Sequence, residues 1–329
     1  MPTVQILLEP AIRTLITPSE ARQAVRDGFV KLVKGDVVLP GVINLDIPEH
    51  AGEVHVKSAY IRGAPYFSIK EAAGFYRNSE KGLPVGSGMI TVFHATTGLL
   101  AAILFDNGHL TELRTAAAGA LAAELLARAA IERVAIVGAG VQARYQLEAL
   151  LDVRKPASVR ICGRSPDRVR ACAAEMAERF GLDVRAMPTI REAVEGADLV
   201  ITVTPAREPL VQPEWIKPGT HVTAVGSDGP EKQELAVGVL AKANKVVADR
   251  LEQCLRLGEI HHAVAAGVLT PAAVHAELGE VAAGTKPGRT SDREITVADL
   301  TGVGVQDAAV ANHVIAAAAR RGLGRTIEI

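Results

Sequence analysis

Alternating apolar and polar positions dominate the first third of the chain and predict β-strands. A helix is predicted at 18–34, where Ser19 is a candidate N-cap and apolar residues recur at helical spacing. Runs with the two-residue rhythm of strands, separated by turns rich in Gly and Pro, occupy residues 36–46, 53–60, 65–70, 88–94 and 99–105. This part of the chain is therefore predicted to be α+β with mainly antiparallel strands.

The pattern changes near residue 111. A long Ala- and Leu-rich helix, LTELRTAAAGALAAELLARAA, runs into the strand-like segment IERVAIVGAG, and from there short Val- and Ile-rich runs alternate with helices. This alternation is typical of an α/β fold with a parallel sheet that helices cover on both faces. A last Ala-rich helix is predicted at 307–321. We expect it to return to the N-terminal domain, which makes that domain discontinuous.

Composition and charge narrow the classes of protein. The chain has 329 residues, is 48% hydrophobic and carries a formal net charge of −1, which favours two domains and gives no basic excess for binding nucleic acid. No segment has the roughly 18 charge-free apolar residues of a membrane span, and MPTVQILLEP lacks the pattern of a signal peptide. Three cysteines without metal-ligand spacing fit the reducing cytoplasm, and no metal site is predicted.

The segment VAIVGAGVQAR carries the strongest motif. Gly138, Gly140 and Ala143 have G-x-G-x-x-A spacing, with an apolar strand before them and a helix after them. The glycines allow a tight turn and a close approach of the backbone, and the helix N-terminus can receive a pyrophosphate. The alternative is a glycine-rich turn in an ordinary α/β fold. The context favours a dinucleotide site.

The residues after the next predicted strand decide which nucleotide fits. An acid at this point would hold a ribose 2′-hydroxyl. The segment ICGRSPDR instead places Arg164 and Ser165 there, with Arg168 one helical turn further. A guanidinium can grip a 2′-phosphate with two hydrogen bonds, so NADP is predicted in preference to NAD. An exposed surface charge is the alternative for Arg164.

Two lysines in apolar strands raise the question of an anionic ligand. In VHVKSAYIRGAPYFSIK, Lys57 shares one face of its strand with His55, and Lys70 is predicted to end the following strand. Either both lysines extend their ammonium groups to solvent, or they meet an anion in a cleft. The sequence alone leaves both interpretations open for Lys57.

Two further charged residues are candidates for the site. Asp228 follows a predicted strand in HVTAVGSDGPEKQEL, at the edge where open α/β sheets bind ligands; a turn or N-cap position is the alternative. Arg114, in TELRTA, is predicted at the N-terminus of the long helix, with a surface position as the alternative. The adjacent His261 and His262 do not share a helix face and therefore indicate no metal.

Six segments together resemble one family. YFSIK, LRTAAAGALAA, VAIVGAGVQARYQLEAL, ADLVITVTP, HVTAVGSDGPEKQEL and DLTGVGVQD occur in this order. They resemble the ornithine cyclodeaminase/μ-crystallin family of NAD(P)-dependent proteins. IPEHAGEVHVKSAY and GEIHHAVAAG are most similar to the ectoine-utilisation branch of that family, which looks close to imine reductases that act on iminosuccinate.

The resemblance implies a domain organisation and a quaternary structure. Residues 1–115 plus 306–329 would form a discontinuous substrate-binding and dimerisation domain of a homodimer, and residues 116–305 an inserted Rossmann domain. The predicted cofactor-binding residues, from the glycine turn and the strand ends, are Gly138, Gly140, Val141, Gln142, Ala143, Arg164, Ser165, Arg168, Thr204, Gly226 and Gly302.

The resemblance also implies roles for three charged residues. Lys70, which ends YFSIK, and Arg114, in LRTA, would hold the carboxylate of the substrate. Lys70 would also take part in proton transfer. Asp228, in GSDGPEKQEL, would handle the substrate nitrogen.

Two departures separate this chain from the cyclodeaminases. These enzymes generally carry an arginine after an early proline, which LPGVINLDIP lacks, and an acid where this chain has Arg164. His55 and Lys57 then look like compensating basic groups for a second acidic group on the substrate. The predicted function is an NAD(P)H-dependent imine reductase that converts a small 2-imino acid, iminosuccinate, to aspartate. An ornithine cyclodeaminase-type ammonia lyase acting on a diamino acid and a non-catalytic NADPH-binding protein are the alternatives.

Overall fold

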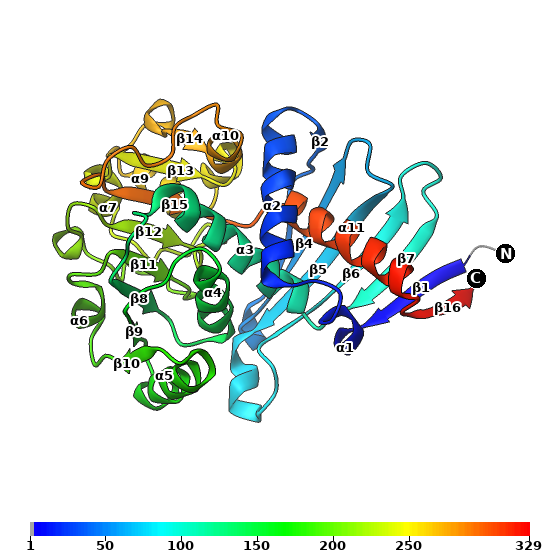
Figure 1. The fold of residues 1–329 in the computed structure, drawn as a ribbon, viewed down its shortest axis with the longest axis horizontal. Coiled ribbons are helices and arrows are strands. Elements are labelled where there is room, and N and C mark those ends of the chain that lie inside the picture. The colour runs from blue at the N-terminus through cyan, green and yellow to red at the C-terminus, as the bar shows by residue number, and fades with distance from the viewer. Residues whose placement is uncertain (1–2) are drawn as a thin grey trace. The chain divides into compact units, whose positions relative to one another are not determined.

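The structure, a computed structural model, describes residues 3–329. The chain divides into an N-terminal unit, which runs to Arg114 and takes in Val303–Ile329, and a central unit, Thr115–Gly302 (Figure 1). The N-terminal unit is therefore discontinuous. The two boundaries predicted from the sequence lie after residues 115 and 305. Within residues 3–329, no helix is both long enough and apolar enough to cross a bilayer.

A mixed eight-stranded sheet forms the centre of the N-terminal unit. Its strands follow the order β16-β1-β7-β6-β5-β4-β2, and β3 also pairs with β4. β1 and β7 are parallel, and the other neighbours are antiparallel. The bounds are β1 Thr3–Leu8, β2 Val37–Val38, β3 Ile43–Ile47, β4 Gly52–Ile61, β5 Tyr66–Phe75, β6 Gly86–His94, β7 Leu100–Phe105 and β16 Arg325–Glu328.

Several strand predictions change in this unit. β1 and β16 do not stand out from the sequence, because β1 is a short run without alternation and β16 has only four residues. The predicted strand 36–46 is interrupted around Pro40 and forms β2 and β3. β5 continues past Lys70 to Phe75, because residues 71–74 remain paired with both β4 and β6. The prediction that Lys70 ends its strand is therefore wrong.

Helices α2 (Pro18–Val33) and α11 (Gly304–Arg321) cover one face of this sheet, and α11 packs against α2, β4 and β5 (Figure 1). The start of α11 lies directly on β4: a Cβ added to Gly304 would be 2.6 Å from the carbonyl oxygen of Ser58. The predicted last helix thus returns to the N-terminal unit. Glycine at this position lets the first turns of α11 bring their side chains close to β4 and β5.

The N-cap of α2 is Thr17 rather than the predicted Ser19. Pro18 occupies the first helical position, where its missing N–H costs nothing. The Thr17 hydroxyl then accepts from the Glu20 backbone N–H, while the Glu20 carboxylate accepts from the Thr17 N–H at 2.8 Å. This reciprocal capping fixes the start of the helix.

The central unit contains a parallel sheet in the order β10-β9-β8-β11-β12-β15-β13-β14. The strand bounds are β8 Arg133–Val137, β9 Ser158–Cys162, β10 Asp183–Ala186, β11 Leu199–Thr202, β12 His221–Ala224, β13 Lys245–Ala248, β14 Ala276–Glu277 and β15 Thr296–Asp299. The inner strands β11, β12, β13 and β15 are buried along their whole length, as expected for a sheet that helices cover on both faces.

The remaining helices complete the two units. They are α1 Glu9–Ile12, α3 His109–Leu126, α4 Val141–Leu151, α5 Pro166–Phe180, α6 Ile190–Val194, α7 Val237–Lys242, α8 Leu251–Cys254, α9 Gly258–Ala265 and α10 Leu278–Ala282, with 3-10 turns at Pro48–His50, Tyr76–Lys81, Pro213–Trp215 and Pro271–Ala273. The fold is the predicted α/β class, with a Rossmann-type parallel sheet inserted in an α+β unit.

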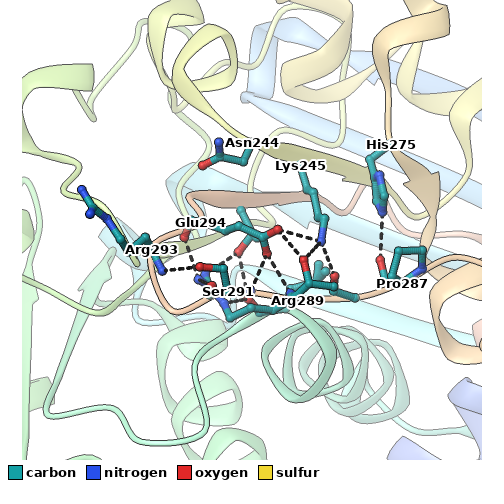
Figure 2. A network of polar contacts seen from close by, with 12 residues as sticks. Asn244, Lys245, His275, Pro287, Arg289, Ser291, Arg293 and Glu294 are labelled. Carbon is teal, nitrogen blue, oxygen red and sulfur yellow. Dashed lines mark hydrogen bonds and ion pairs between the residues drawn. The ribbon is translucent and has the colours of Figure 1, made fainter.

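A polar network holds the segment before β15 against the sheet (Figure 2). The buried ammonium of Lys245 lies 2.9 Å from the Glu294 carboxylate and donates to the Gly288 carbonyl at 2.6 Å. The Arg289 guanidinium donates to the Glu294 carbonyl and to the Thr296 hydroxyl. Burial alone would raise the pKa of Glu294, but hydrogen bonds from Thr290 and the Lys245 ammonium lower that pKa to about 2, so the carboxylate stays ionised.

Candidate active site

The glycine turn between β8 and α4 is shaped for a backbone-bound anion. Gly138 has φ +122°, and a Cβ there would lie 2.8 Å from the Val203 carbonyl oxygen. Gly140 is the N-cap of α4 and provides no side-chain cap, and a Cβ there would have no atom within 4 Å. The first turn of α4, with the exposed Val141, thus opens on free space. This site fits a pyrophosphate. It has free space and the N–H groups of the helix start, and its backbone admits only glycine at position 138.

The next strand end lies beside this turn. A Cβ on Gly163, directly after β9, would be 3.7 Å from the Ala139 N atom of the glycine turn. Arg164 follows and is exposed, as is Arg168 on α5. Ser165 is the N-cap of α5, and its hydroxyl makes no capping hydrogen bond. The segment that carries Arg164 and Ser165 therefore begins next to the glycine turn.

Three of the remaining predicted nucleotide residues, Thr204, Gly226 and Gly302, follow the carboxyl ends of other strands, and two lie in α4. Thr204 follows β11 and Gly226 follows β12, and the two touch: a Cβ on Gly226 would be 2.1 Å from the Thr204 carbonyl oxygen. Gly302 follows β15 with φ +79° and donates its N–H to Asp249, 2.7 Å away. Gln142 in α4 accepts from the Gln146 amide. Ala143 is fully buried in the core under α4.

Buried cations form a second cluster, in the N-terminal unit. Lys57 on β4 and Lys70 on β5 are directly opposite in the antiparallel pair, so their Cα atoms are about 5 Å apart and their side chains share one face of the sheet. They are 4% and 2% exposed, and Arg114 is 4% exposed. The interpretation that these groups extend to solvent is wrong for all three residues.

Asp307 links two of these cations. Its Oδ1 accepts from Arg114 Nε at 2.9 Å, and its Oδ2 lies 3.8 Å from Lys70 Nζ. Gln306 accepts from Arg114 Nη1 at 3.5 Å and donates to the Arg114 carbonyl. Arg114 is the sixth residue of α3, which begins at His109, so the prediction that it lies at the helix N-terminus is wrong. The cluster of Lys57, Lys70, Arg114 and Asp307, called here the cationic cluster, has more cations than carboxylates.

Sequence reasoning missed Asp307, Gln306 and Asp106. The first two end the segment DLTGVGVQD, whose chemistry only becomes visible once α11 packs on β4 and β5. Asp106 precedes α3, is 1% exposed and accepts from the Leu110 N–H at 2.6 Å. Burial raises its pKa to about 6, and the charge of Asp307 adds to that rise. The sequence did contain a signal for Asp106, because an Asp in the turn FDNGHL, just before a helix, is typical of a residue that caps the helix N-terminus.

The other two predicted substrate residues are less enclosed. His55 shares the face of Lys57, and its Nε2 lies 3.7 Å from the Glu53 carboxylate. Asp228, in the central unit, has a side chain that is 37% exposed, and its Oδ1 accepts from Lys232 Nζ at 2.7 Å. Asp228 follows β12 in an irregular segment, so it caps no helix.

The order of the parallel sheet and the strand–glycine turn–helix at its centre define a dinucleotide-binding protein of the Rossmann class. The family model that matches is that of the ornithine cyclodeaminase/mu-crystallin family, over residues 4–321. The chain belongs to this family.

Three solved structures are similar over nearly the whole chain. Delta(1)-pyrroline-2-carboxylate reductase of Thermococcus litoralis, in complex with NADH and L-proline, is 31% identical, with 98% of this chain and 100% of that chain covered and a TM-score of 0.94. An archaeal alanine dehydrogenase dimer with bound NAD is 36% identical, with both chains fully covered and a TM-score of 0.92. The iminosuccinate reductase of Paracoccus denitrificans with NAD⁺ is 30% identical, again with full coverage and a TM-score of 0.90. With such relatives and this nucleotide fold, the chain is an NAD(P)-dependent oxidoreductase.

Proposed function

We propose that this protein is an imine reductase that uses NAD(P)H to convert iminosuccinate to aspartate. The observation that carries the proposal is the cationic cluster, which gathers the buried cations Lys57, Lys70 and Arg114, with Asp307 between the last two. A site lined mainly by positive charge creates a positive potential, so a cluster of this composition favours an anionic ligand. The similarity to reductases of 2-imino acids supports the same reaction class.

The register of β4 and β5 supports a ligand with two carboxylates. Arg114 and Lys70 suffice to hold the α-carboxylate, since a guanidinium and an ammonium together supply several donors. Lys57 lies opposite Lys70 on the same face, within reach of a second carboxylate on a four-carbon acid. His55, two residues from Lys57 on that face of β4, provides a second side chain for contact with this carboxylate.

The residues of this chain supply the protons and the orientation for reduction. Bound NAD(P)H supplies the hydride. Lys70 donates a proton to the imine nitrogen, and the resulting iminium accepts a hydride at its carbon more readily than the neutral imine. Asp228 stabilises the cationic nitrogen before the hydride arrives. Arg114 and Lys70 fix the carboxylate, which orients the imine carbon, and the product is the neutral amine of aspartate before it takes up a proton from solvent.

A spectrophotometric screen tests this proposal. Oxaloacetate, pyruvate and other 2-oxo acids are mixed with ammonia and either NADH or NADPH, and absorbance at the reduced nicotinamide band is followed. Net consumption of the reduced cofactor, fastest with oxaloacetate, is expected. Ammonia release from a diamino acid without net cofactor turnover would instead identify a cyclodeaminase-type lyase, and tight nucleotide binding without either activity a binding protein.

We further propose that NADPH binds more tightly than NADH. Arg164 is exposed beside the glycine turn and occupies the place of a ribose-binding acid. Because a hydrogen bond to a charged group contributes about 1.5–3 kcal/mol, Arg164→Ala should weaken NADPH binding roughly tenfold or more and leave NADH binding unchanged. Fluorescence titration of both nucleotides measures this, with Arg191→Ala, an exposed arginine on α6, as the control. Equal losses for NADPH and NADH would refute the assignment.

A homodimer is also proposed, through the face of the N-terminal sheet opposite to α2 and α11. Phe67 and Phe93 stack there at 5.1 Å, and Ile69 lies beside them; all three are half-exposed. Ile69→Glu should convert the dimer to a monomer in light scattering at micromolar concentration, because it puts a charge into an apolar interface. Val268→Glu, at an exposed apolar position of the central unit, should leave the dimer intact. A monomeric wild-type protein would contradict the proposal.

A further inference from the structure

Glu234 is a fully buried carboxylate that has no part in the proposed reaction. It lies after β12, in the segment KQEL, and is 0% exposed. Its Oε1 accepts from the Thr204 N–H at 2.6 Å and from the Thr204 hydroxyl at 2.8 Å. Its Oε2 accepts from the Thr202 hydroxyl and from the Gly226 N–H, both at 2.7 Å. One side chain therefore joins the carboxyl end of β11 to that of β12.

We propose that Glu234 is a positioning residue for the nicotinamide half of the dinucleotide, through the backbone of Thr204 and Gly226. The glycine turn after β8 receives the pyrophosphate, and the strand on one side of it, β9, ends at the residues that meet the adenosine ribose. β11 and β12 lie on the other side of β8. Their carboxyl ends therefore face the nicotinamide half, and Glu234 fixes both of them. The inference rests on the proposed nucleotide-dependent function.

The backbones of Thr204 and Gly226, at the ends of β11 and β12, are in close contact. A Cβ on Gly226 would lie 2.1 Å from the Thr204 carbonyl oxygen and 2.6 Å from its N atom. The Thr204 hydroxyl also accepts from the Ala206 N–H at 3.3 Å, which leaves its hydrogen for Glu234. The Glu234 carboxylate thus accepts hydrogen bonds from both Thr204 and Gly226, whose backbones are too close together for a side chain at Gly226.

Glu234 is itself anchored from a third element. Glu259, on α9 and 1% exposed, accepts from the Glu234 N–H at 2.8 Å and from the Leu235 N–H at 3.1 Å. The backbone that carries Glu234 is therefore held independently of its side chain. A change of the Glu234 carboxylate should act on Thr204 and Gly226 rather than release the whole segment.

Glutamine cannot replace Glu234 here, for a geometric reason. Each carboxylate oxygen faces one backbone N–H, which can only donate: Thr204 N–H at Oε1 and Gly226 N–H at Oε2. The two threonine hydroxyls can turn to accept, but the backbone N–H groups cannot. In either orientation of the Gln amide, one backbone N–H would face an NH₂ group. The two strand ends would then move apart.

The test measures nucleotide binding rather than turnover. Glu234→Gln should raise the Kd for NADH, by fluorescence titration well below the unfolding temperature, by roughly tenfold or more, because a buried donor loses its partner. Glu294→Gln is the matched control: Glu294 also accepts from a backbone N–H, Thr290 at 2.9 Å, but it precedes β15 and so lies at the amino ends of the parallel strands rather than at their carboxyl ends. It should lower the unfolding temperature and leave the Kd unchanged.

A second variant covers the case in which Glu234→Gln does not fold. Thr202→Val removes one hydroxyl donor to Glu234 and keeps both backbone contacts, and it should raise the Kd for NADH by about threefold. A Kd within twofold of wild type in a folded Glu234→Gln protein whose unfolding temperature falls would show a purely structural role and overturn the inference. If wild-type protein binds NADH but reduces no imine, the proposed reaction fails while this inference stands.

Discussion

Replacing Arg114 by methionine is expected to lower kcat/KM for every imino acid by about 10³-fold. Arg114 is buried, donates to Asp307 at 2.9 Å and is proposed to hold the α-carboxylate that all these substrates share. Truncating one partner of a buried charge pair costs about 2–5 kcal/mol, much of it from the charge that is left unpaired. Steady-state kinetics with iminosuccinate and with the imine of pyruvate measure the loss.

Two controls separate binding from folding in the Arg114 variants. Arg114→Lys retains the charge but loses the planar fork, so it should lose less activity than Arg114→Met. The Kd for NADH should stay unchanged in both, because the side-chain partners of Arg114 are Asp307 and Gln306, neither of which is a proposed nucleotide-binding residue. Activity of Arg114→Met within a few-fold of wild type would show that another group holds the carboxylate.

Lys57→Met is expected to discriminate between substrates. It should reduce kcat/KM for iminosuccinate by on the order of 10²-fold, because the second carboxylate loses a buried cation. The imine of pyruvate has no second carboxylate and should be reduced at nearly the wild-type rate. Methionine keeps most of the volume of the lysine stem, so the effect reports charge rather than a cavity.

The neighbouring lysine provides the matched comparison. Lys70→Met changes the same residue type at the directly opposite position, but it should impair both substrates, because Lys70 is proposed to meet the shared carboxylate and the imine nitrogen. If Lys57→Met lost both activities equally, or neither, Lys57 would be a structural lysine. The preference for a dicarboxylic imine would then lose its main support.

The opposition of Lys57 and Lys70 was accessible from the sequence, although the burial of the two lysines was not. A hairpin whose turn is centred on Gly63 and Ala64 pairs residues that are equally distant from that centre, and the structure has Lys57 opposite Lys70 in this register. Whether the shared face is covered depends on α11, which comes from the other end of the chain. The choice between a solvent-exposed and a buried lysine therefore needed the structure.

Elsewhere too, features formed by contiguous residues could be predicted from the sequence, whereas features that depend on distant segments could not. The glycine turn could be predicted because strand, turn and helix are contiguous in VAIVGAGVQAR. The insertion of β15 between β12 and β13 could not, since strand order is set by packing rather than by local pattern. Asp307 was missed for a related reason: its partner Arg114 is 193 residues away, and neither position alone indicates an ion pair.

The most direct test of the proposed reaction follows the hydride itself. The enzyme is incubated with oxaloacetate, ammonia and NAD(P)H that carries deuterium at both hydrogen positions of nicotinamide C4, and the aspartate formed is examined by mass spectrometry and NMR. The account predicts one deuterium at C2 of aspartate, with one reduced nucleotide consumed for each aspartate formed. Ammonia release from a diamino acid without net consumption of the nucleotide, or no deuterium in any amino-acid product, would contradict it.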